Sequence, residues 1–102
     1  MWICLNNSFL SIVRKDCRPD ELLVRARRNG DIEKAFPGAK VEKTPFADYL
    51  YRAVVPETDV QQGLAAAVTR IDYPNFKNSV KGSIIHQAYA KVWGVMYGLQ
   101  RP

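Results

Sequence analysis

Apolar and polar residues alternate in short runs over the first half of the chain, which is the pattern of β-strands. The runs WICL and FLSIV flank the turn-forming residues NNS, and this arrangement predicts a β-hairpin with strands near residues 2–5 and 9–14. ELLVRARR predicts a third strand. AKVEKT and DYLYRAVV predict two further strands, joined by a loop around Pro45.

Three segments have helical patterns instead. NGDIEKAFPG predicts a short helix, with Asp31 as the candidate N-cap. After Pro56 the apolar residues recur at helical spacing and predict an amphipathic helix over residues 58–71, which opens with a capping box in the stretch TDVQ. A last helix is predicted from about Ser83 to Leu99.

The predicted order is strand, strand, strand, helix, strand, strand, helix, helix. Strands without long crossovers favour a mainly antiparallel five-stranded sheet with the helices on one face, which is an α+β fold. The third, fourth and fifth strands with their helices match most of the split β-α-β unit of ferredoxin-like domains, and the N-terminal hairpin extends that sheet. Neither a linker nor a repeat divides the sequence, so residues 1–102 are expected to form one domain.

Composition agrees with a globular protein, because 47% of the residues are hydrophobic and 25% are charged. The apolar N-terminus is interrupted at Asn6 and lacks a preceding basic residue, so it is a poor export signal. No segment has the length that a bilayer span needs, and a cytoplasmic protein without membrane contact is expected. The two cysteines are therefore expected to be reduced, with Cys4 in the core.

The net charge of +5 is distributed unevenly. All ten acidic residues precede Tyr73, whereas the remaining chain carries Lys77, Lys81, Lys91 and Arg101 without any acid. A surface of one sign attracts polyanions or acidic protein patches. The alternative is that these cations only keep an apolar segment soluble.

Arginines are expected on one face of the sheet. On the third strand, Arg25 and Arg27 alternate with the apolar positions that face the helices. On the fifth strand, Arg52 is expected on the same open face, with Tyr49 on the opposite one. RNA-recognition modules present a similar sheet face to single strands, but LLVRARR lacks the aromatic residues on which bases stack. The alternative is an ordinary charged, solvated sheet face.

The last predicted helix is apolar around most of its circumference. At 100° per residue, only the arc that holds Gln87, Lys91, Gly94 and Gly98 is not apolar or aromatic. A surface helix needs a much narrower apolar stripe, of about 100°. Either both sides of the helix are buried within the chain, or part of the arc contacts another molecule through interface-type residues such as Trp93.

The segment IDYPNFKNSV decides between these two interpretations. Tyr73 and Phe76 would pack on Trp93 if this segment folds back over the last helix and closes the core. If it does not fold back, the same residues form an exposed patch of aromatic and basic side chains.

Catalytic chemistry is not indicated. His86 is the only histidine, and no acidic residue follows it in the chain. Neither cysteine has the spacing of a zinc site, and no glycine-rich loop opens a helix in a phosphate-binding pattern. No catalytic residue, metal ligand or cofactor is therefore predicted.

The stretches ELLVRARRNGDIEKAFPGAKV, ADYLYRAVVP, IDYPNFKNSV and HQAYAKVWGVMYGLQ together resemble a family of small uncharacterised bacterial and mobile-element proteins. The resemblance covers nearly the whole chain. It implies a stand-alone cytoplasmic protein, and it brings no activity and no functional residue.

The leading prediction is a non-enzymatic interaction protein that binds a protein complex or nucleic acid. Two alternatives stay open: an inhibitor of a host defence complex of the anti-CRISPR kind, by analogy of size alone, and a small single-stranded RNA- or DNA-binding protein. A homodimer through the last helix is also considered. The predicted partner-binding residues are Arg25, Arg27, Arg52, Tyr73, Phe76, Lys77, Tyr89, Trp93 and Tyr97.

Overall fold

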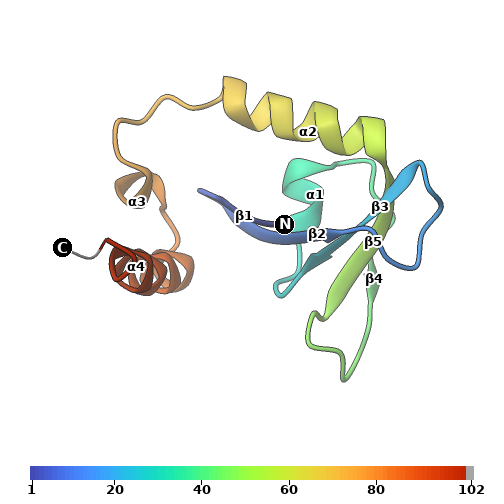
Figure 1. The fold of residues 1–102 in the computed structure, drawn as a ribbon, viewed down its shortest axis with the longest axis horizontal. Coiled ribbons are helices and arrows are strands. Elements are labelled where there is room, and N and C mark those ends of the chain that lie inside the picture. Colours follow the sequence, from blue (N-terminus) through green and yellow to red (C-terminus); the bar gives the residue numbers. More distant parts are fainter. Residues whose placement is uncertain (101–102) are drawn as a thin grey trace.

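A computed structural model describes residues 1–100 and shows an α+β fold, as predicted (Figure 1). Five strands and four helices alternate in nearly the expected order, with one short extra helix. Their bounds are β1 Trp2–Leu5, β2 Ser8–Val13, β3 Glu21–Ala26, α1 Asp31–Ala35, β4 Glu42–Lys43, β5 Tyr51–Pro56, α2 Glu57–Thr69, α3 Phe76–Ser79 and α4 Ser83–Tyr97.

All five strands form one antiparallel sheet in the order β1-β2-β3-β5-β4. Because β3 and β4 each pair antiparallel with β5 between them, they run parallel to one another and are connected through α1. This is the predicted split β-α-β unit. The relation to ferredoxin-like domains is not confirmed, because two helices follow α2 in the described chain instead of a returning strand.

The main core lies between one face of the sheet and helices α1 and α2. Leu10 of β2 and Val24 of β3 are fully buried there, together with Ile32 of α1 and Val60 of α2. Residues next to these in the strands, such as Arg25, point to the other face because side chains alternate along a strand. The apolar residues that alternate with polar ones along the strands therefore form the sheet side of this core.

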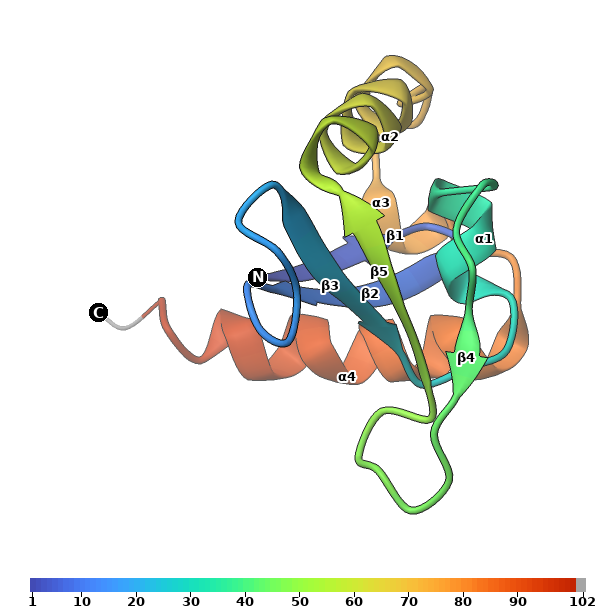
Figure 2. The ribbon, with the colours of Figure 1, turned by 90° about the vertical axis from the view of Figure 1, so that its right-hand side faces the viewer.

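Helices α3 and α4 belong to a second, smaller cluster. Val80, Ile85 and Tyr89 are buried in it and pack with Phe76 and with Phe9 of β2. Phe9 lies on the sheet face opposite to Leu10, so α4 lies on the other side of the sheet from α2 (Figure 2). The expectation that the helices gather on one face holds for α1 and α2 and not for α4.

The helix starts differ from the predicted caps. Gly30, in the left-handed region at φ 92°, precedes α1, and Asp31 is the first helical residue. The buried Asp31 carboxylate instead accepts hydrogen bonds from the backbone N–H of Phe9 and from the guanidinium of Arg28. It ties α1 to the start of β2.

The capping box predicted for α2 does not form. The helix begins at Glu57, directly after Pro56, and no side chain caps it. Thr58 therefore lies inside the first turn, where its hydroxyl no longer occupies the cap position. The prediction placed the helix start one residue too late.

Cys4 is exposed, and the prediction that it lies in the core is wrong. It belongs to β1, the edge strand, and its side chain lies on the sheet face that α1 and α2 leave uncovered. Alternation alone could not reveal this, because an edge strand at the margin of the sheet has little to pack against.

Candidate functional site

Helix α4 exposes most of its large apolar side chains. Trp93 is 55% exposed and Tyr97 is 59% exposed, although residues of this kind are usually covered in a globular protein. We call the exposed apolar residues of this region the α4 surface. It consists of Ile84, Val92, Trp93, Val95, Met96, Tyr97 and Leu99.

Two residues hold α4 to the rest of the molecule. Ile85 and Tyr89 are its only buried side chains, and both lie in its first two turns. The Tyr89 hydroxyl donates a buried hydrogen bond of 2.8 Å to the carbonyl oxygen of Ser8, at the start of β2. Burial of the phenol raises the pKa of Tyr89 well above its ordinary value. The second half of α4 therefore projects its side chains into solvent.

The segment IDYPNFKNSV contains the short helix α3, which the sequence pattern did not predict. The Asn75 side chain caps this helix by accepting a hydrogen bond from the backbone N–H of Asn78. Phe76 then packs against Tyr89, with ring centroids 5.5 Å apart, and Tyr73 packs edge-on against Phe76 at 6.0 Å. The segment thus closes the small cluster around Tyr89.

The segment covers Trp93 only in part. The Lys77 ammonium lies 4.7 Å from the centre of the Trp93 ring, which is a cation–π contact. Trp93 also stacks with Tyr97, with ring centroids 5.4 Å apart. The predicted packing of Tyr73 and Phe76 on Trp93 is therefore not formed, and Tyr89 takes that place.

A cavity of about 420 Å³ opens between α3, α4 and β1. Phe76, Tyr89 and Trp93 form its aromatic wall, and Cys4 lines it from β1. Lys77 is the only charged residue of the lining. This cavity joins β1 to α3 and α4, which are far from it in the sequence.

The three predicted arginines share the sheet face opposite to the main core, as expected; α4 lies on this face too, but none of the three arginines lines this cavity. Arg25 and Arg52 are direct cross-strand partners. The guanidinium groups of Arg25 and Arg27 lie 4.6 Å and 4.3 Å from the ring centre of Tyr49. Arg25 also donates to the Ser11 hydroxyl, and Arg27 donates to the backbone carbonyl of Asp48.

Tyr49 was predicted on the opposite face, and this was wrong. Strand β5 begins only at Tyr51, so Tyr49 belongs to the preceding loop and does not follow the strand alternation. Its ring is 4% exposed, because Arg25 and Arg27 lie against it. It therefore offers no free ring on which a nucleic-acid base could stack.

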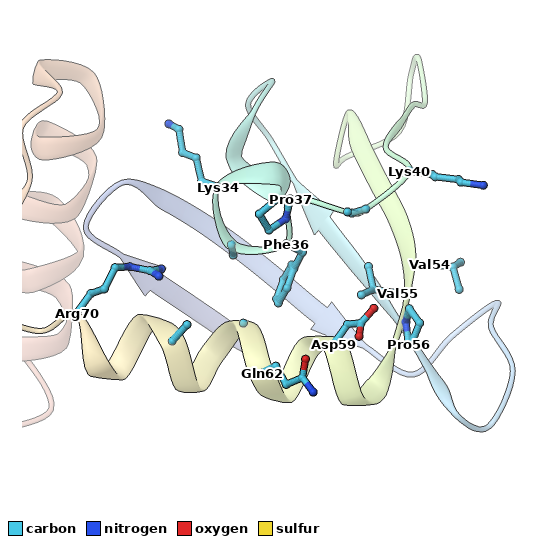
Figure 3. A pocket seen from close by; sticks show the side chains of 15 residues that line it. Lys34, Phe36, Pro37, Lys40, Val54, Val55, Pro56, Asp59, Gln62 and Arg70 are labelled. Carbon is cyan, nitrogen blue, oxygen red and sulfur yellow. The ribbon is translucent and has the colours of Figure 1, made fainter.

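A second cavity, of about 620 Å³, lies between α1 and α2 (Figure 3). Phe36 projects from the end of α1 toward α2, and Asp59 of α2 points into the same space. Lys34 lines it too, but its ammonium is already used by the carbonyl of Asn7 and by Asp31. Size alone does not make this cavity a site.

The structure thus brings part of the predicted set together. Tyr73, Phe76, Lys77, Tyr89, Trp93 and Tyr97 lie together on α3, α4 and the segment before them. Sequence reasoning missed the contribution of β1, since nothing in WICL indicates which strand becomes the edge of the sheet. It also placed Tyr89 among exposed contacts, whereas only 6% of it is exposed.

Comparison of the chain with protein-family models, with curated proteins and with solved structures finds no match. Within residues 1–100, no helix is long and apolar enough to cross a membrane. The same residues contain no group of three or more histidine, cysteine or acidic side chains arranged to hold a metal ion.

Proposed function

We propose that this protein is a non-enzymatic interaction protein and that it binds a protein partner through the α4 surface. The observation that carries the proposal is the exposure of large apolar side chains in the second half of α4, a helix in which only Ile85 and Tyr89 are buried. Exposed apolar patches of this extent mark interaction sites in folded proteins.

A protein partner fits the α4 surface better than a nucleic acid. Trp93 and Tyr97 could stack on bases, but Val92, Val95 and Met96 lie between and beside them. Aliphatic side chains do not stack, whereas they fill apolar grooves of protein interfaces.

The charges near α4 favour a partner with carboxylates around its apolar groove. Lys77 lies against the Trp93 ring, and no acidic residue occurs after Asp72. Opposite charges at the rim of an interface speed association and select against basic partners.

The α4 surface also fits an enclosing groove better than a flat lipid surface. Its exposed apolar residues occupy two sides of the helix, because Ile84 and Val95 lie roughly opposite to Tyr97 at about 100° per residue. An interfacial membrane helix needs one apolar face and a strongly polar one.

A pair of valines provides a matched test. Val95 on α4 is 73% exposed and Val68 on α2 is 66% exposed, so Asp at either position disturbs the core equally little. The immobilised protein is incubated with nuclease-treated bacterial extract, and the retained protein is then purified. We expect Val95→Asp to weaken binding of this purified partner at least about tenfold, and Val68→Asp to leave it unchanged.

Two results would overturn the proposal. One is equal affinity of the partner for the wild type and for Val95→Asp, because the contact would then lie elsewhere. The other is a bound species that nuclease removes and whose affinity falls steeply with added salt, which is the behaviour of a nucleic acid.

A further inference from the structure

Strand β1 leaves one edge of the sheet unpaired. It pairs with β2 on one side and has no strand on the other within residues 1–100. Met1 and Ile12 exchange both backbone hydrogen bonds, at 2.7 Å and 2.8 Å. Hydrogen-bonded and non-hydrogen-bonded pairs alternate along an antiparallel ladder, so Trp2 and Cys4 form non-hydrogen-bonded pairs with β2. The N–H and C=O groups of these two residues therefore point toward the free edge.

Two adjoining cavities form a groove beside the second half of β1 and the turn that follows it. The cavity of about 420 Å³ is lined by Cys4, and a neighbouring one of about 510 Å³ is lined by Asn6 at the end of the same strand. Pro74 and Asn75 line both cavities, so the segment before α3 forms the opposite wall. The two cavities therefore lie end to end between β1 and this segment.

We infer that an extended segment of the partner protein adds to β1 as a further strand and inserts an apolar side chain into the cavity between α3 and α4. This inference rests on the proposed function and specifies how the partner binds. An unpaired edge strand is a template for such pairing, and a pocket beside it selects every second side chain of the added strand.

The side-chain alternation matches this geometry. Trp2 and Cys4 point their side chains to the sheet face on which α4 lies, and residues opposite them on an added strand point to the same face. Such a residue meets the wall of Phe76, Tyr89 and Trp93. Since Lys77 is the one charge of this lining, a carboxylate next to the apolar residue would complement it.

A single extended segment fits the groove better than a second copy of this chain. The opposite wall, formed around Pro74 and Asn75, faces the β1 edge through both cavities. If a second copy paired through its own β1, the two β1 strands would have to approach to about 4.8 Å. The segment around Pro74 and Asn75 of each copy would then collide with the other copy.

Cys4 allows a direct test, because its backbone N–H points outward and its side chain is exposed. Cys4→Pro removes that donor without removing a bond to β2, and proline is tolerated on a sheet edge of this kind. Cys4→Ala is the matched control, since it removes the thiol and keeps the N–H. The probe is a displayed library of random peptides that is selected on the full-length protein.

We expect the selected peptides to contain an apolar residue beside an acidic one, and to bind wild type and Cys4→Ala alike. Binding to Cys4→Pro should be weaker by about tenfold, because the hydrogen bond from the Cys4 N–H to the peptide is lost and the neighbouring hydrogen bonds are disturbed. A second measurement needs no variant: methylation of single peptide nitrogens should weaken binding at every second position only.

Three results would overturn strand addition. The first is equal binding to Cys4→Pro, the second is methylation sensitivity without alternation, and the third is a β1-paired dimer of this chain that occupies the edge. If Val95→Asp still loses the partner protein in any of these cases, the proposed function stands and only the mode of binding is wrong. If Val95→Asp keeps the partner, both fail.

Discussion

Position 63 decides how closely α2 approaches α1. A Cβ atom at Gly63 would lie 2.5 Å from Cε1 of Phe36 and 2.8 Å from the backbone oxygen of Ala35. The Phe36 ring is buried, so it has little room to move. Glycine at this position lets the two helices cover the same sheet face.

Gly63→Ala should therefore lower the free energy of unfolding by about 1–3 kcal/mol, because overpacking forces Phe36 or the helix to shift. Urea denaturation measures the change. Gly94→Ala in α4 is the control: no atom lies within 4 Å of its added Cβ, and the gain in helix propensity should stabilise α4 by up to ~1 kcal/mol. Equal effects of the two substitutions would contradict the close approach.

Single residues were predictable where one local rule decides their place. Leu10 and Val24 follow strand alternation into the core, and Arg25 follows it to the other face. Cys4 and Asp31 did not follow their local rules, because an edge strand and a buried carboxylate depend on contacts distant in sequence.

At the scale of elements, α4 is joined to the sheet mainly by one polar contact within an apolar cluster. The Tyr89 hydroxyl donates to Ser8 across a long sequence separation, and the ring packs on Phe76. Because burial raises the pKa of Tyr89, the folded state keeps the phenolic proton more tightly than the unfolded state does.

Tyr89→Phe should lower the free energy of unfolding by about 1 kcal/mol at neutral pH, through loss of the hydrogen bond to Ser8. The protonated phenol contributes fully to the free energy of unfolding below the unfolded pKa of ~10, and this contribution is lost as pH rises above that value. The difference in the free energy of unfolding between wild type and Tyr89→Phe should therefore narrow at alkaline pH. Denaturation at neutral and alkaline pH checks both points. Tyr97→Phe, on an exposed ring, should change little; a gap that stays constant with pH would contradict the role of the buried phenol.

Elements with a clear period were predictable, and short ones were not. The N-terminal hairpin, β3, α2 and α4 lie close to their predicted bounds. Strand β4 has only two residues, and α3 depends on one Asn75 cap, so neither creates a period to detect. The cap itself is a signal that could have been used, since Asn is a preferred N-cap residue.

On the scale of the whole molecule, two cores lie on opposite sides of one sheet. The larger core contains α1 and α2, and the smaller one holds α4 by its first half. The wide apolar arc of the last helix predicted that this helix either is buried on both sides or contacts a partner. The exposed second half of α4 favours a partner, and the sequence could not decide this because coverage depends on where α3 and β1 lie.

The arginine face and the cavity between α1 and α2 are the competing surfaces. Arg25 and Arg27 are held by Tyr49 and by hydrogen bonds within the chain. The cavity between α1 and α2 is larger than the one beside α4, but volume alone does not make it a site. The α4 surface differs from both, since its large apolar side chains are about half exposed or more.

Amide hydrogen exchange with and without the purified partner tests the central claim most directly. The account predicts that the partner slows exchange in the second half of α4 and at Trp2 and Cys4, and leaves β3, β5 and the α1–α2 cavity unchanged. Slowing that is confined to the arginine face of β3 and β5, or to the cavity between α1 and α2, would contradict it.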